Sequence, residues 1–350
     1  MRHTIWTSVL TTMFLITGSA YAQESGERDP LFSSNDVLEI TISAPFKALM
    51  SKRPDEEDWS GKLSYVDEAG ATVELEIGLR TRGKYRRQQR VCPFAPIRLN
   101  IKKSAAKDTL FRKQDKLKLV THCRNGSERS EQVTMREYLM YRFLNDLTDF
   151  SFSVRLLKIT YVYTDKTDKR ETRYGFLIEH KDRLAKRIDM PRLELTHTSS
   201  ASLAGEYTNL ASVFQYFIAN TDFSPIASAP DSFCCHNSSL FGKAGQKYYS
   251  IPYDFDMAGL VDAPYAEPNP KFRIRSVRQR LYRGRCMNNG HLSNTLQQFR
   301  DRRETYYSMV ENMPDLTVKS KKGMYVLMDR FYNLINDPGS VEKKMARKCV

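Results

Sequence analysis

The apolar residues of this chain follow two different periods in its two halves, and this change limits the folds that it can adopt. In the first half they alternate with polar residues, as in LEITISAPF from Leu38 and ATVELEIGLRTRG at 71–83, which predicts strands. One helix is expected at 130–147, and further strands are expected at 94–103, 115–123, 153–163 and 171–180. The last two strands should form a hairpin, because the charged link TDKTDKR joins them. We therefore expect an antiparallel sheet with one inserted helix.

The second half has mainly helical spacing. LASVFQYFIANT at 210–221 predicts an apolar helix, and LSNTLQQFRDRRETYYSMVENM and KGMYVLMDRFYNLIND predict further helices near the end. Two short strands, SSLFG and KYYSI, are expected between them. The chain should therefore consist of a β-rich N-lobe with one helix, residues 37–180, and a helical C-lobe, residues 181–350. The polar residues 23–36 predict a flexible lead-in to the first lobe.

The N-terminus predicts the compartment of the protein. Arg2 and His3 precede an apolar run, IWTSVLTTMFLITG, which ends shortly before Ala20-Tyr21-Ala22. A charged start, an apolar core and a small-x-small site are typical of a secretory signal peptide, here residues 1–22. The apolar run is shorter than the ~20 residues that a membrane span needs. We expect a secreted protein, periplasmic or extracellular, with no transmembrane segment after cleavage.

The six cysteines all follow the expected cleavage site. An even number in an exported chain favours disulfides over metal thiolates, and the chain has no CxxC pair of the kind that a zinc ribbon needs. The pairs that we favour are Cys92 with Cys123 and Cys286 with Cys349. The neighbouring Cys234 and Cys235 stay unassigned at this stage.

The formal net charge of +14 points to an acidic partner or a polyanionic surface. Export argues against nucleic acid, and the sequence has no zinc-finger or RNP-like pattern. The phosphates of a nucleotide or an anionic envelope surface are better candidates. The arginines between Arg273 and Arg285 either form a surface for an anionic substrate or are simply solvated.

The stretch IPYDFDMAGL, residues 251–260, carries the most chemical information. It places Asp254 and Asp256 directly after an expected strand. Mg²⁺ and Mn²⁺ favour such oxygen ligands, and Mg²⁺ usually binds through one or two carboxylates and substrate phosphates. The alternative is that both acids are loop residues that pair with some of the 55 lysines and arginines.

Three polar elements follow one another in a meaningful order. An apolar helix ends at Asp222, Asn237 precedes one short strand, and Asp254 follows the next strand. Phosphoryl-transfer enzymes of the kinase type use this order: the first Asp orients the attacking hydroxyl, and the Asn and the later Asp hold metal ions. Catalysis of this kind depends on positioning and charge neutralisation, so these side chains must converge on one cleft.

At these residues the chain resembles the CotH-like family of secreted atypical kinases. The resemblance lies in LRTRGKYRR, in the REYLMYRFLNDL helix with the hairpin after it, in IANTDFS with CCHNSSLF, and in IPYDFDMAGL. These stretches span most of residues 75–260. The resemblance implies an α+β, atypical protein-kinase-like fold, with a β-rich N-terminal lobe and a mainly helical C-terminal lobe.

The resemblance also implies roles for single residues. Asp222 would be catalytic and orient the substrate hydroxyl, and the metal ligands would be Asn237 and Asp254. Asp256 would be a further metal ligand or a network residue. The nucleotide ATP would be bound by residues of the first lobe: Arg82, Gly83, Arg98, Lys118, Glu137 and Glu179. Among these, Glu137 would pair with a phosphate-binding cation such as Lys118, as in the lysine–glutamate pair of kinases. Glu179 would contact the base through its backbone, or it is a salt-bridged strand end.

The expected function is therefore transfer of phosphate from ATP to a hydroxyl, with Mg²⁺ or Mn²⁺, on an envelope or extracellular protein or a glycan. Two alternatives stay open. The same metal cleft could transfer AMP instead of phosphate. The protein could also be a non-catalytic, pseudokinase-like surface or matrix-binding module, because bulky basic residues follow Gly83 and the phosphate-binding lysine is not clear from the sequence.

Overall fold

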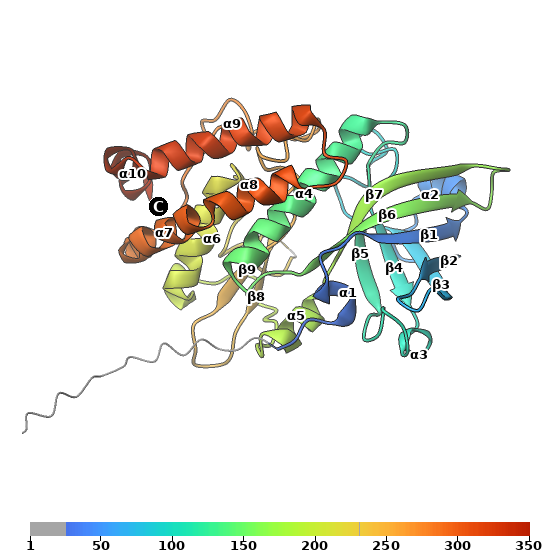
Figure 1. The fold of residues 1–350 in the computed structure, drawn as a ribbon. Helices are drawn as coiled ribbons and strands as arrows, with labels where there is room; N and C mark the ends of the chain where they lie inside the picture. Colours follow the sequence, from blue (N-terminus) through green and yellow to red (C-terminus); the bar gives the residue numbers. More distant parts are fainter. Residues whose placement is uncertain (1–25, 231) are drawn as a thin grey trace, which may run out of the picture.

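The computed structural model of this protein describes residues 26–230 and 232–350 (Figure 1). The expected signal peptide lies outside the described residues. Within the expected lead-in, α1 (Pro30–Ser33) buries Leu31 and Phe32. The buried carboxylate of Asp29 accepts hydrogen bonds from Arg183 at 2.6 Å and Gln114 at 2.9 Å. Asp29, Leu31 and Phe32 therefore anchor this segment to the rest of the fold.

The strands of the first half form a closed barrel in the order β1-β2-β3-β4-β5-β7-β6. Apolar side chains fill its interior, where Ile42, Leu79 and Leu99 are completely buried. The bounds are β1 (Leu38–Ala44), β2 (Trp59–Val66), β3 (Thr72–Thr81), β4 (Ile97–Ile101), β5 (Lys116–Val120), β6 (Val154–Tyr163) and β7 (Arg170–Ile178). Two short helices, α2 (Phe46–Lys52) and α3 (Lys103–Ala106), lie in the connections.

The barrel shows that the expected kinase-like fold is wrong. That fold required an open β-rich lobe, whereas here β1 lies parallel to β6 from Leu38 opposite Leu157 to Ala44 opposite Tyr163. This pairing joins the two strands that would otherwise be free edges, and closure removes both edges. The expectation of a purely antiparallel sheet is wrong for the same reason. The other neighbouring strands do pair antiparallel.

Helix α4 (Glu128–Leu147) lies between the barrel and the remaining helices (Figure 1). The hydroxyl of Ser127 caps its first turn by accepting from the Ser130 main-chain nitrogen at 3.3 Å. Buried residues occur on all sides of this helix, as expected for one that packs against neighbours on both faces. For example, Phe143 contacts both Phe217 and Tyr306 of the helical half.

The second half contains the remaining helices and one hairpin. The hairpin consists of β8 (Ser238–Phe241) and β9 (Tyr249–Pro252). The helices are α5 (Lys181–Arg187), α6 (Gly205–Phe217), α7 (Leu292–Asp301), α8 (Arg303–Glu311), α9 (Val318–Ile335) and α10 (Pro338–Lys344). The single helical segment expected from residue 292 is divided at Arg302, whose guanidinium donates to the Asp146 carbonyl at 3.1 Å.

Three cysteine pairs lie at disulfide distance. The predicted pairs Cys92–Cys123 and Cys286–Cys349 are confirmed, and Cys234 pairs with its neighbour Cys235. Such pairs are compatible with an oxidising compartment outside the cytosol. Of the helices that the structure describes, none combines the length and the apolar character that crossing a bilayer requires.

Candidate functional site

The β8–β9 hairpin brings two of the predicted site residues to one end. Asn237 directly precedes β8 and Asp254 follows β9 by two residues. Ser238 is opposite Pro252 in the hairpin, and the Tyr253 main-chain nitrogen donates to the Asn237 carbonyl at 2.9 Å. Asn237 and Asp254 both have left-handed backbone conformations, with φ of 51° and 63°. The hydroxyl of Tyr141 on α4 accepts from the Asp254 main-chain nitrogen at 2.8 Å, which fixes this turn against the core.

Asp222 lies beside Asn237, as the sequence predicted. The Asn237 amide nitrogen donates to the Asp222 carboxylate at 3.0 Å and to its carbonyl at 2.7 Å. On its other carboxylate oxygen, Asp222 is 2.8 Å from Nε2 of His236. This hydrogen bond raises the pKa of His236 above 6.5, although partial burial opposes the shift. The Asp222 carboxylate is thus fixed in orientation by two residues, His236 and Asn237, that are distant from it in the sequence.

His236 was not among the predicted site residues, although it directly follows two cysteines and directly precedes Asn237. The distance between the ring and Asp222 could not be inferred from the sequence, because 14 residues separate them.

Arg86 holds three acids together at the base of the site. Its guanidinium lies 3.1 Å from the Glu137 carboxylate, 3.2 Å from that of Asp256 and 3.5 Å from that of Asp254. Glu137 is fully buried, and this burial raises its pKa, while the positive charge of Arg86 opposes the rise. Burial likewise raises the pKa of Asp256, again against Arg86. The partner of Glu137 is therefore Arg86, a residue of the loop after β3, and not the predicted Lys118.

Three cations of the barrel lie above this network. Lys118 on β5 is opposite Arg98 on β4, and its ammonium is 4.6 Å from the centre of the Tyr253 ring. Burial, followed by the charge of Arg82, lowers the pKa of Lys118 to about 7. Burial and the charge of Arg86 also lower the pKa of Arg82, and its Nε is buried without a hydrogen-bond partner. These side chains therefore place cationic groups beside Asp254, with one guanidinium nitrogen left without a hydrogen-bond partner.

Glycine is required at one point of this cluster. Gly83 follows Arg82 with φ of 88°, a conformation that side chains disfavour. It turns the chain from β3 into the loop that carries Arg86. Gly83 thereby determines how the two arginines are placed relative to each other.

Glu179 lies at the end of β7 and its carboxylate is occupied. It forms a buried ion pair with Arg187 at 2.8 Å and accepts from the Ser153 main-chain nitrogen at 2.9 Å. Its own main-chain nitrogen donates to the Ser153 carbonyl. The structure thus contains the salt-bridged strand end that the sequence analysis had considered, while a backbone contact with adenine stays a prediction.

The residues can be compared with what Mg²⁺ or Mn²⁺ requires. Within residues 26–230 and 232–350, no three His, Cys, Asp or Glu side chains could hold an ion by themselves. However, Mg²⁺ that shares substrate phosphates needs only one or two protein carboxylates. Asp254 is 43% exposed, and Asn237 directs its amide nitrogen at Asp222, which leaves its amide oxygen available as a metal ligand. These two residues fit such a shared ion, whereas Asp256 is committed to Arg86.

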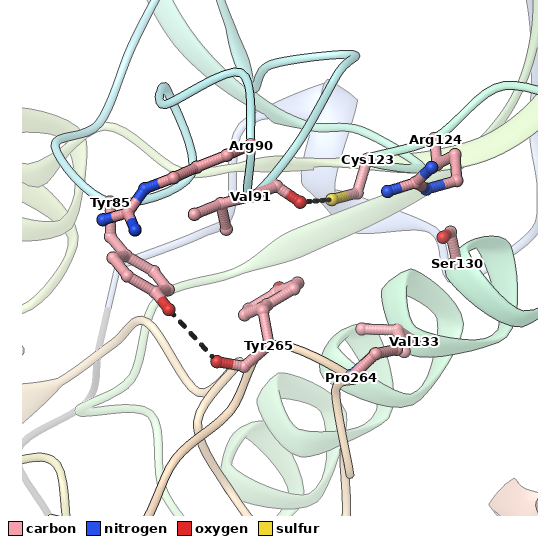
Figure 2. A pocket seen from close by; sticks show the side chains of 9 residues that line it. All are labelled: Tyr85, Arg90, Val91, Cys123, Arg124, Ser130, Val133, Pro264 and Tyr265. Atoms are coloured by element: carbon pink, nitrogen blue, oxygen red, sulfur yellow. Dashed lines mark hydrogen bonds between the residues drawn. The ribbon is translucent and has the colours of Figure 1, made fainter.

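A separate pocket of about 370 Å³ lies beyond the Arg86 loop, between that loop and the start of α4 (Figure 2). Its walls include Tyr85, Arg90 and Val133, and the Tyr85 hydroxyl donates to the Tyr265 carbonyl at 3.3 Å. None of the predicted site residues lines it. The pocket is therefore not the cluster itself, but it adjoins the same loop, since Tyr85 directly precedes Arg86.

The fold and the site thus define a protein with a closed, mostly antiparallel β-barrel, a helical half and a polar cluster between the two. No known protein-family profile matches this chain, and none of the curated proteins compared with it matches either. Its function must be argued from the cluster itself.

Proposed function

We propose that this protein transfers a phosphoryl group from ATP to a hydroxyl of an exported protein or a glycan. The observation that carries the proposal is the position of two cationic side chains, Arg82 and Lys118, beside Asp254, with the Nε of Arg82 buried and unpaired. A polyphosphate would neutralise these cations and supply acceptors for the unpaired Nε of Arg82. No other group among the described residues satisfies that nitrogen.

Each residue has a distinct task in this proposal. Lys118 and Arg82 bind the phosphates, and Arg98 adds positive charge beside Lys118.

Asp222, fixed by Asn237 and His236, accepts a hydrogen bond from the acceptor hydroxyl and orients it. A divalent cation held by Asn237 and Asp254 would neutralise charge on the transferred group. Arg86 keeps Asp254 in place through its ion pairs with Glu137 and Asp256.

The proposed location is the periplasm or the extracellular space. It rests on the signal-peptide pattern of residues 1–22 and on the three cysteine pairs. The acceptor would accordingly be an envelope or extracellular molecule. This location also requires that ATP be available outside the cytosol.

Labelled ATP tests the proposal. The purified protein should incorporate label from the γ-phosphate of ATP in the presence of Mg²⁺ or Mn²⁺. The Asp222→Asn and Asp254→Ala variants should lose at least about a hundredfold in rate, as expected for groups that act on the reacting atoms. Asp108→Ala is the matched control, because Asp108 is exposed in a distant loop. Label from the α-phosphate alone would instead indicate AMP transfer.

A binding measurement separates catalysis from a purely binding role. ATP with Mn²⁺ should raise the midpoint of thermal unfolding, because a ligand that binds only the native state stabilises it. Lys118→Met should remove this increase. If ATP neither stabilises the wild-type protein nor labels anything, the proposal fails and a non-catalytic binding module is the remaining interpretation.

A further inference from the structure

Four arginines of the segment 271–285 form two groups with different environments. Arg280 belongs to the first group: it donates to the carbonyls of Tyr216 and Phe217 at 2.9 and 2.8 Å, at the end of α6. Arg283 also belongs to it, since it donates to the carbonyls of Thr221 at 3.0 Å and Phe223 at 2.6 Å. These two carbonyls flank Asp222. The first group therefore holds the loop that carries the proposed catalytic residue.

The second group is exposed and has no internal partner. Arg273 and Arg275 are both exposed, and neither forms an ion pair with any described residue. Ile274 between them is half-buried and anchors the segment. By contrast, Arg278 lies 3.9 Å from the Asp262 carboxylate. Arg273 and Arg275 thus present two unneutralised guanidinium groups to solvent.

Aromatic packing links this exposed pair to the loop that carries Asp222. The Arg283 guanidinium is 4.5 Å from the centre of the Phe223 ring and 4.6 Å from that of Phe272. Phe223 directly follows Asp222, and Phe272 directly precedes Arg273. Arg283 therefore connects the catalytic loop to the exposed basic segment. A hydroxyl oriented by Asp222 would have neighbouring groups within the field of these arginines.

We propose that Arg273 and Arg275 bind acidic residues of a protein acceptor next to the hydroxyl presented to Asp222. This inference rests on the proposed function, to which it adds the class of acceptor. Guanidinium groups bind carboxylates through paired hydrogen bonds, and the half-buried Phe272 offers an apolar contact that suits a peptide better than an anionic sugar. The formal charge of +14 adds long-range attraction for an acidic chain.

Fluorescence polarisation tests this inference without ATP or catalysis. The probe is a fluorescein-labelled peptide with one serine flanked by glutamates, compared with the same peptide carrying glutamines. The wild-type protein should bind the glutamate peptide at least about tenfold more tightly, and the difference should shrink as salt is raised. Arg273→Glu with Arg275→Glu should abolish this preference. The control is Lys107→Glu with Arg112→Glu, two exposed cations far along the chain, which should retain it.

The outcomes are distinct. Equal binding of both peptides, or equal losses in the two double variants, would overturn the inference. Tighter binding of heparin or of phosphatidylserine vesicles through the same arginines would also overturn it, since the acceptor class would then be wrong. Peptide binding that persists in a protein without transfer activity would count against the proposed function alone.

Discussion

The guanidinium of Arg86 lies 3.1 Å from the carboxylate of Glu137, a side chain with no exposed surface. The same arginine also reaches Asp254 and Asp256. A single cation from the loop after β3 therefore neutralises acids from α4 and from the segment after β9. This relationship makes the stability of the protein and the position of Asp254 depend on one residue.

Replacing Arg86 should strongly destabilise the protein. Arg86→Ala leaves Glu137 and Asp256 buried without their partner, which costs about 3–5 kcal/mol in the free energy of unfolding. Urea unfolding measures this value. The double variant with Glu137→Gln should lose clearly less than the sum of the two single changes, because the uncompensated charge is then removed. Full additivity would show that the two residues do not interact as described.

Lys118 should give the stability a particular pH dependence. Its pKa is about 7 in the folded protein, compared with the ordinary value of 10.5 that applies to the unfolded chain. Between these two pH values the unfolded chain therefore binds more protons than the folded protein. The contribution of this group therefore makes stability rise as the pH increases from 7 to 10.5. Unfolding curves of the wild type and of Lys118→Met should differ in slope over this range. Identical slopes would mean that Lys118 titrates normally.

Lys118 should also take up a proton when ATP binds. The phosphates favour the charged ammonium, so its pKa rises in the complex. Calorimetric titrations above pH 7, in buffers with different heats of ionisation, should show proton uptake that disappears in Lys118→Met. Absence of uptake would place the phosphates elsewhere.

His236 should affect the pH dependence of stability in the opposite direction to Lys118. Its pKa is raised above 6.5 by the hydrogen bond with Asp222. The stability that this pair contributes is therefore fully present below pH 6.5 and is lost as the pH rises through the raised pKa. A nuclear magnetic resonance titration from about pH 5 to about pH 8 follows the ring directly. In Asp222→Asn the pKa should fall back toward 6.5. An unchanged pKa would contradict the pairing.

Removing the hydroxyl of Tyr141 should reduce stability and activity more than removing that of Tyr138, which lies on the same helix. Tyr141→Phe removes the acceptor for the Asp254 main-chain nitrogen and should cost about 1–3 kcal/mol of stability. Transfer activity should fall as well, since Asp254 loses its anchor. Tyr138→Phe is the control on the same helix, because its hydroxyl accepts only from Arg142. Similar effects of both changes would indicate a general loss of packing.

Some parts of the fold were predictable and others were missed. The pattern of apolar residues around Leu75 and Leu157 identified β3 and β6 correctly. Side chains on one face of β3, and on both faces at the start of β6, are buried. The strand β2 was missed because WSGKLSYV buries fully only Leu63 and Tyr65. Helices α2 and α5 were also missed, as seven residues give too short a pattern.

The candidate site likewise contains residues that were predicted and residues that were missed. The residues Asp222, Asn237 and Asp254 were found in order, and the structure places Asp222 and Asn237 in contact. The role of Arg86 was missed: the bulky basic residues after Gly83 were noted, but no buried partner was predicted for any of them. Nothing local distinguishes Arg86 from Arg87, which instead pairs with Asp55 at 2.5 Å. Burial alone separates the two side chains, and burial is a property of the folded chain.

The sequence by itself determined the long strands, helix α4, two of the cysteine pairs and the order of the polar residues, since each depends mainly on local pattern or on a small set of possible partners. Only the tertiary structure decided that β1 closes the barrel against β6 and that Glu137 pairs with Arg86. Both contacts join segments that are far apart in the sequence. Their free energies depend on the burial and desolvation of the strands and charged groups, which cannot be inferred from the local sequence pattern.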